Sequence, residues 1–140
     1  MIFLDTSVLI AVAQVNHQHH APSRALWDLC AAQQAAVSTH TLAEIYNTLT
    51  AVPPPLRISP RDAVLVIETF LERLTPVALT ADEYLETMRN MARLGLSGGI
   101  IYDSLHLACA RKIDAERIFT WNVKHFRLAA PDLAGRIVTP

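Results

Sequence analysis

The sequence lacks several features that mark common enzyme and transport classes. It has only four glycines, and it contains no G-x-G-x-x-G, no G-x-x-x-x-G-K-[ST] and no G-x-S-x-G segment. A glycine-rich phosphate loop and the nucleophile turn of an α/β-hydrolase are therefore excluded. The longest aliphatic run near the start, VLIAVA at 8–13, is far too short to span a bilayer, so we expect no membrane association.

Cysteine and charge are also scarce. Cys30 and Cys109 belong to no C-x-x-C pair and stand in apolar helical contexts, so we expect reduced core residues. No second ligand pair matches the histidines of NHQHH at 16–20, which we expect in a surface loop without zinc. Only MIFL precedes Asp5, without the basic segment of a secretory signal, and we expect a cytoplasmic protein. The net charge of −1 argues against a protein that coats nucleic acid without sequence preference. It is compatible with a nucleic-acid enzyme that has a local basic patch.

The chain is rich in apolar residues, which make up 51% of its 140 residues against 18% charged. This length and composition predict a single domain over residues 1–140. Short apolar runs alternate with helical patterns, which predicts a parallel sheet with helices on both faces. We expect strands at 1–4, 35–39, 76–79, 117–121 and 136–140, and helices at 8–13, 23–34, 41–51, 59–74, 80–95 and 100–112, with a loop or a single helical turn at 122–126.

Three acids fall where such a sheet would gather them. Asp5 directly follows the first strand, Glu44 lies about one helical turn after the second, and Asp103 lies in the first turn of a helix. Ligands of parallel sheets bind beyond the carboxyl ends of the strands. Clustered carboxylates repel one another and persist mostly where a cation offsets their charge. Hard oxygen ligands favour Mg²⁺ or Mn²⁺, and such an ion activates water and stabilises a phosphoryl transition state.

Each acid also has a purely structural interpretation, which the sequence leaves open. Asp5 fits a helix N-cap, and Glu44 follows Thr41 at the spacing of a capping box. Asp103 would be favoured by the positive end of its helix. His106 lies three residues after Asp103 on the same helical face, where it orients that carboxylate, lines the site or simply packs in the core.

Four segments, in this order, resemble the PIN-domain proteins: FLDTSVLIA, TLAEIYNTL, GGIIYDSLHLACA and TWNVKHF. They extend over essentially the whole chain, and its short length is most similar to the VapC-type toxins of bacterial toxin–antitoxin pairs. The resemblance implies a three-layer α/β/α sandwich with a central, mostly parallel sheet. It also implies a Mg²⁺- or Mn²⁺-dependent endoribonuclease that cleaves structured RNA such as tRNA or rRNA. The implied partners are a second copy of the chain and a small antitoxin of the VapB type.

The resemblance assigns the metal-binding and catalytic acids residue by residue. Asp5, Glu44 and Asp103 match the first, second and third acid of the family. A hydroxyl at Thr6 or Ser7 matches positions that support the first acid.

The fourth segment departs from the family pattern. Thr120 matches its hydroxyl, but Asn122 stands where an acid is common and His125 stands at the later acidic position. Asn122 would complete the catalytic and metal-binding set through its carbonyl oxygen, whereas His125 would either contact phosphate or pack. Fewer acids predict at most one well-occupied metal site, with a second ion dependent on substrate phosphate. The alternative is a PIN-like module that has lost catalytic power and binds RNA or a partner.

Overall fold

The structure is a computed structural model that describes residues 1–30 and 34–140. Its sheet has the strand order β3-β2-β1-β4-β5, and each neighbouring pair of strands is parallel. The first strand therefore lies at the centre of the sheet. The strands are β1 (Ile2–Leu4), β2 (Ala35–Ser38), β3 (Leu74–Val77), β4 (Arg117–Phe119) and β5 (Ile137–Val138).

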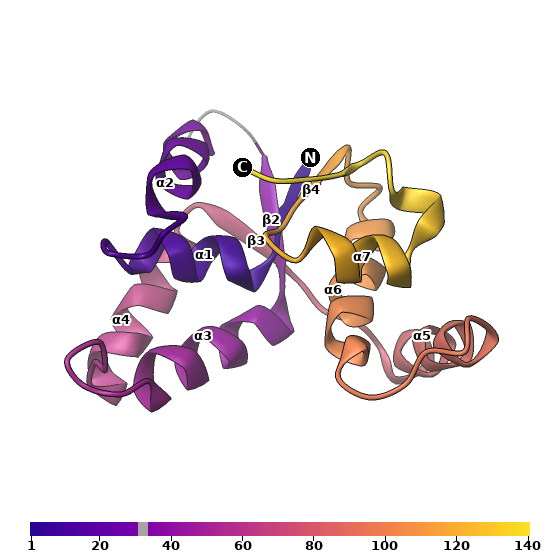
Figure 1. Cartoon of the computed structure of the whole chain (residues 1–140), viewed down its shortest axis with the longest axis horizontal. Coiled ribbons are helices and arrows are strands. Elements are labelled where there is room, and N and C mark those ends of the chain that lie inside the picture. Colours follow the sequence, from indigo (N-terminus) through magenta and orange to yellow (C-terminus); the bar gives the residue numbers. More distant parts are fainter. Residues whose placement is uncertain (31–33) are drawn as a thin grey trace.

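Helices cover both faces of the sheet (Figure 1). The first four pack on one face, whereas α6 and α7 pack on the other and α5 lies against α6. This arrangement confirms the three-layer α/β/α class, and none of the helices in the described ranges is long and apolar enough to cross a membrane. The helices are α1 (Thr6–Ala13), α2 (His20–Leu29), α3 (Thr39–Ala51), α4 (Pro60–Leu71), α5 (Ala81–Arg93), α6 (Ile100–Lys112) and α7 (Val123–Ala129), and a 3₁₀ turn follows at Pro131–Leu133.

The central strand β1 contributes to two apolar clusters, one on each face. Ile2 and Leu4 pack among residues of α1 to α4, while Phe3 between them packs with Leu107 of α6 and Phe126 of α7. Successive side chains of a strand point to opposite faces, so three residues are enough to anchor both layers. The end of β1 is thereby fixed relative to α3 and α6, the two helices that carry the second and third acid.

Several helices differ from the sequence prediction. The structure starts α1 and α3 two residues earlier than predicted, and the segment predicted as a loop or a single helical turn at 122–126 belongs to the longer helix α7. Helix α2 begins at His20 instead of Ser23, because Pro22 is tolerated in the first turn of a helix, where its missing N–H needs no partner. The predicted extension of this helix over residues 31–33 lies outside the described residues. Helix α4 ends at Leu71, earlier than expected, and β3 begins at Leu74.

The T-x-x-E segments at Thr80 and at Thr41 behave differently. The first forms a capping box, in which the side chains of Thr80 and Glu83 cap α5 reciprocally. The box between Thr41 and Glu44 is wrong, because α3 begins at Thr39 and is capped by Ser38. The side chain of Glu44 is therefore not used as a helix cap.

Candidate active site

The three predicted acids gather at the carboxyl edge of the sheet, where its strand order reverses. The chain continues from β1 to β2 on one side, and β4 lies on the other side of β1, so Asp5 follows the central strand at this switch point. Glu44 is in the second turn of α3, which starts directly from β2, and Asp103 is in the first turn of α6. Segments that are far apart in the sequence thus supply one acid each.

Asp5 is buried, with 3% of its surface exposed. Its Oδ2 accepts hydrogen bonds from the hydroxyl of Ser7 at 2.6 Å and from the hydroxyl of Thr120 at 2.9 Å. The same oxygen accepts from the backbone N–H of Ser7 at 3.3 Å, which caps α1. The N-cap interpretation of Asp5 is therefore correct, and it coexists with a place in the acid cluster.

The fourth segment is tied to Asp5 through two hydroxyl groups. The backbone N–H of Trp121 donates to Ser7 Oγ at 3.0 Å, and that of Asn122 donates to Thr120 Oγ1 at 2.9 Å. These bonds fix the turn between β4 and α7 beside the first acid. The side chain of Asn122 does not cap α7, and the residue is exposed, so its role as a ligand stays a prediction.

Glu44 is held at one carboxylate oxygen. Its Oε2 accepts hydrogen bonds from the hydroxyl of Thr6 and from His106 Nε2, the latter at 2.9 Å. Burial is the largest single influence on Glu44 and opposes its ionisation. The hydrogen bonds from His106 and Thr6 and the charges of His106 and His40 together outweigh burial and lower the pKa of the carboxyl below its usual value. The sequence offered Thr6 and Ser7 as alternative supports of the first acid; Ser7 has that role, whereas Thr6 contacts the second acid.

Asp103 lies in surroundings that oppose its ionisation. Its side chain is 16% exposed, and His125 Nδ1 lies 3.6 Å from its Oδ2. Burial and the negative charges of Asp5 and Glu44 raise the pKa of Asp103 to about 6, against the influence of nearby histidines. The three acids therefore act on one another electrostatically, which the helix-end interpretation of Asp103 does not explain.

His106 is buried between the first two acids. Its side chain is 2% exposed, and its Nε2 lies 2.9 Å from Glu44 Oε2 and 3.8 Å from Asp5 Oδ1. Burial works against a charged ring, but the hydrogen bond with Glu44 and the charges of the three acids raise the pKa of His106. The sequence placed this residue beside Asp103 or in the core, and its hydrogen bond to Glu44 was not foreseen.

His40 is a second residue that sequence reasoning missed. Its Nε2 lies 3.7 Å from Glu44 Oε1, and its ring stacks on Tyr102 with centroids 5.2 Å apart and an angle of 3° between the planes. Its position four residues before Glu44 on the same helix was the available signal, because such residues share a helical face. His40 and Tyr102 thus border the acid cluster on the sides of α3 and α6.

The donor set fits a hard divalent cation. Within residues 1–30 and 34–140, no three His, Cys, Asp or Glu side chains stand close enough to hold a metal ion together. Like charges keep carboxylates apart, and repulsion by Asp5 and Glu44 adds to burial in raising the pKa of Asp103. Carboxylate oxygens are the ligands that Mg²⁺ and Mn²⁺ prefer, so Asp5, Glu44 and Asp103 are the residues that would hold the ion.

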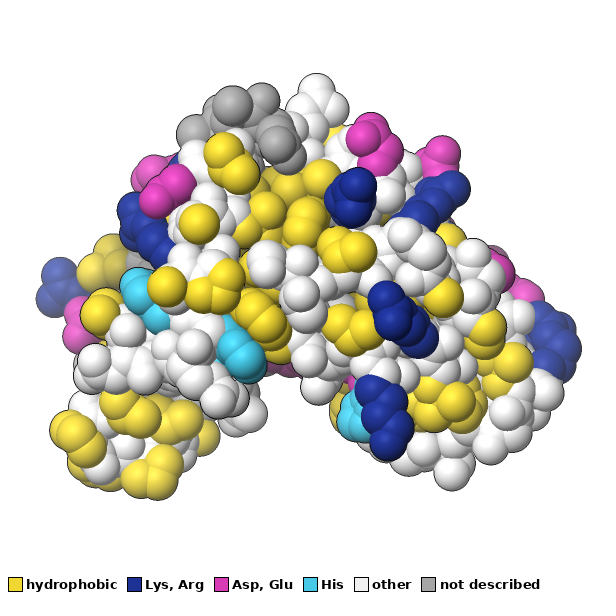
Figure 2. All heavy atoms as spheres, turned by 45° about the horizontal axis from the view of Figure 1, so that its top comes forward, with side chains coloured by type: hydrophobic (Ala, Val, Ile, Leu, Met, Phe, Trp, Pro, Cys, Tyr) yellow, Lys and Arg dark blue, Asp and Glu magenta, His cyan; other side chains and the backbone are white. Residues whose placement is uncertain are grey.

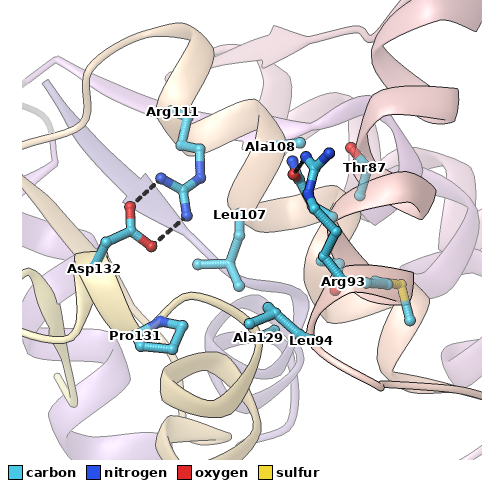
Figure 3. A pocket seen from close by; sticks show the side chains of 12 residues that line it. Thr87, Arg93, Leu94, Leu107, Ala108, Arg111, Ala129, Pro131 and Asp132 are labelled. Atoms are coloured by element: carbon cyan, nitrogen blue, oxygen red, sulfur yellow. Dashed lines mark hydrogen bonds and ion pairs between the residues drawn. The ribbon is translucent and has the colours of Figure 1, made fainter.

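A groove of about 420 Å³ lies elsewhere, between α5, α6 and the segment after α7 (Figure 3). Arg111 and Asp132 form a two-bonded ion pair along one side of it, and Arg93 projects on the other. None of the predicted site residues lines this groove. It is therefore separate from the acid cluster.

Basic side chains near the C-terminal half are mostly engaged within the molecule. Arg111 pairs with Asp132, Lys112 with Glu83, and Arg127 donates to the carbonyl of Ile137. On the face seen in Figure 2, the described Lys and Arg side chains are scattered instead of forming a continuous basic surface. A local contact with phosphate fits this distribution better than an extended nucleic-acid groove.

Comparison with known proteins decides the family. Residues 2–130 match the family model of the PIN domain. The chain belongs to the PIN-domain family. Its similarity to curated relatives places this PIN domain with the VapC type: it is 36% identical over 114 residues to ribonuclease VapC27 of Mycobacterium tuberculosis, covering 81% of this chain and 79% of that protein. Ribonuclease VapC40 of the same species is 34% identical over 109 residues, which are 75% of each protein.

Solved structures of PIN-domain toxins have the same fold. The crystal structure of VapC20 from Mycobacterium tuberculosis, described as a sarcin–ricin-loop-cleaving toxin, superposes with a TM-score of 0.72 at 21% identity, covering 89% of this chain and 92% of that one. A toxin–antitoxin complex from Klebsiella pneumoniae gives a TM-score of 0.65 at 18% identity, covering 100% and 98%. The predicted PIN-like α/β/α fold is thereby confirmed.

Proposed function

We propose that this PIN domain is a metal-dependent endoribonuclease that hydrolyses RNA phosphodiester bonds. The observation that carries the proposal is the gathering of Asp5, Glu44 and Asp103 at the switch point of the sheet, each with a hydroxyl or imidazole group nearby. The 36% identity to a protein named ribonuclease VapC27 supports RNA as the substrate. We assign the ion as Mg²⁺ or Mn²⁺ from the oxygen donors.

The residues of the site would have different roles toward the ion and the water. Asp5 and Asp103 supply carboxylate oxygens as direct ligands, and Asn122 adds a carbonyl oxygen at the rim. When bound, the ion supplies charge that stabilises the phosphoryl transition state and acidifies water. The lowered pKa of Glu44 keeps it ionised at neutral pH, so that its free oxygen would hold the ion through a bound water and orient that water.

A divalent charge at this site would also change the state of Asp103. With a pKa of about 6, its carboxyl group carries some proton near neutral pH. A nearby positive ion favours the ionised form, so metal binding would release this proton. We therefore expect the apparent metal affinity to rise between pH 5 and 7.

We further propose that the protein is the toxin of a toxin–antitoxin pair and acts in the cytoplasm. Support comes from the fold shared with the toxin–antitoxin complex of Klebsiella pneumoniae. The partner would be a small antitoxin of the VapB type, and the active form a homodimer. The sarcin–ricin loop named for VapC20 supports a structured target such as rRNA or tRNA.

A second candidate function is a binding module with little catalytic power. The exposed Asn122 and the position of His125 beside Asp103 favour it, because both replace acids of the family pattern. Incubation of the purified chain with total RNA and Mg²⁺ separates the two functions. The nuclease cleaves RNA, and the isosteric Asp5→Asn variant does not; the module binds RNA in a gel-shift assay without cleaving it. Glu68→Gln, an exposed acid on α4, is the control and retains full cleavage.

A further inference from the structure

We infer that His106 is a positioning residue of the acid cluster: its buried Nε2–H holds the carboxylate of Glu44 so that one oxygen of that acid stays turned toward the metal. The inference rests on the proposed function, because it assigns a role toward the ion that the acids would bind. It concerns a residue for which the sequence offered packing, a contact with Asp103 or a place lining the site, but no contact with Glu44.

The first argument is which carboxylate oxygens of Asp5 and Glu44 accept hydrogen bonds. Asp5 is held through Oδ2 by Ser7 and Thr120, and Glu44 is held through Oε2 by His106 and Thr6. The structure gives no hydrogen bond to Asp5 Oδ1 from any described residue, and His106 Nε2 stays 3.8 Å away from it. The other oxygen of Glu44 lies 3.7 Å from His40, also beyond hydrogen-bond distance. Each acid thus has one anchored oxygen and one that is available to an ion.

The second argument is what it costs to bury a histidine here. His106 is 2% exposed, and its ring lies among Phe3 and Phe126, with both centroid distances at 6.4 Å. Its Nδ1 is buried and has no hydrogen-bond partner within the described ranges. An apolar side chain of similar size would fill this space without leaving a polar atom unpaired. Packing alone therefore does not account for a histidine at this position.

The third argument is the direction of the ring. Only Nε2 has an acceptor, so in the neutral ring the hydrogen resides on Nε2 and points to Glu44. Because the buried ring lies between Phe3 of β1 and Phe126 of α7, it has little room to turn this donor away from Glu44. The side chain of Glu44 is flexible and 27% exposed, and without the donor of His106 its carboxylate would be held by the hydroxyl of Thr6 alone. Groups that orient metal ligands in this way contribute roughly 10–100-fold in metal affinity.

Two substitutions distinguish a role of His106 as hydrogen-bond donor from a role in packing alone. His106→Gln keeps an amide N–H the same number of bonds from the backbone as Nε2, whereas His106→Asn places it at the position of Nδ1, short of Glu44. We expect Mn²⁺ affinity, measured by electron paramagnetic resonance of the free ion, to stay within about threefold of wild type in the glutamine variant. In the asparagine variant it should fall by at least about tenfold, with cleavage falling in parallel.

Two outcomes overturn the inference. In the first, both variants keep the Mn²⁺ affinity of wild type, which shows that no donor is needed. In the second, both variants lose Mn²⁺ affinity to the same extent, which shows that the position of the donor does not matter. Leu107→Ala, which truncates a buried neighbour on α6 that does not contact the acids, controls for loss of stability and should keep wild-type affinity. If the wild-type chain itself neither binds Mn²⁺ nor cleaves RNA, the proposed function fails; if it does both and the variants behave alike, only the role of His106 fails.

Discussion

The hydroxyl of Thr120 donates a hydrogen bond of 2.9 Å to Oδ2 of Asp5, across 115 residues of sequence. Thr120 follows β4 and Asp5 follows β1, which are neighbouring strands on the two sides of the switch point. Both side chains are buried. This bond joins the first and last segments of the candidate site and sets the orientation of the first acid.

Thr120→Val should therefore weaken both the fold and the site. The isosteric change removes the donor to Asp5 and leaves the backbone N–H of Asn122 without its acceptor. We expect a loss of about 1–3 kcal/mol in the free energy of unfolding, measured with urea, and a weaker Mn²⁺ complex. Thr120→Ser keeps the hydroxyl and should stay within about 1 kcal/mol of wild type. A valine variant with wild-type stability and affinity would show that the hydrogen bond does not hold Asp5.

Asp103→Asn should make the metal-free protein more stable while abolishing cleavage. The folded-state pKa of about 6 lies above the ordinary aspartate pKa of 3.8, so the folded state binds this proton more tightly than the unfolded state does. The stabilisation from that proton is complete below about pH 4 and is lost as the pH rises through 6. At pH 7.5 without metal, the asparagine variant should gain up to about 3 kcal/mol.

The pH dependence provides the control for this prediction. The difference in unfolding free energy between wild type and Asp103→Asn should grow from pH 4 to pH 7 and then level off. Groups far from Asp103 are common to both proteins and cancel in the difference, whereas Glu44 and His106, which act on Asp103 electrostatically, contribute to it. If the difference in unfolding free energy is constant across this range, or if the variant unfolds more easily at pH 7.5, Asp103 has a structural role instead.

The sequence predicted the layers and the acids better than the contacts among them. Alternating apolar runs fix which segments become strands, and the carboxyl ends of parallel strands must share an edge, so Asp5 and Glu44 followed from topology. The predicted capping box at Thr41 failed because Ser38 already caps α3 one turn earlier. The bond between His106 and Glu44 spans 62 residues and depends on how α6 rotates on the sheet, which short motifs do not specify.

The metal stoichiometry tests the consequence of the altered fourth segment. Asn122 is neutral, and His125 lies near Asp103, so this side of the site has fewer negative charges than the family pattern. Isothermal titration with Mn²⁺ in the absence of RNA should give at most one tight site for wild type. Asn122→Asp adds a carboxylate and should strengthen a second, weaker site. Two tight sites in the wild-type protein would contradict the prediction.

Metal binding should also stabilise the folded chain. An ion that binds only the folded state raises its stability by about 2.7 kcal/mol at a concentration 100 times the dissociation constant. Differential scanning calorimetry should therefore show a Tm that rises with Mn²⁺ in wild type and in Glu68→Gln, but not in Asp5→Asn. An equal rise in Asp5→Asn would place the ion away from the acid cluster.

The most direct test of the central claim is a kinetic cycle on RNA cleavage. Single-turnover rates would be measured in Mg²⁺ for wild type, Asp5→Asn, Asp103→Asn and the double variant, with EDTA as the metal-free reference. If both acids hold one ion, each single variant loses more than about 100-fold, and the double variant loses little beyond either, because groups that act as a unit are not additive. Cleavage that persists in EDTA, or losses that simply multiply in the double variant, would contradict a single metal-dependent site formed by these acids.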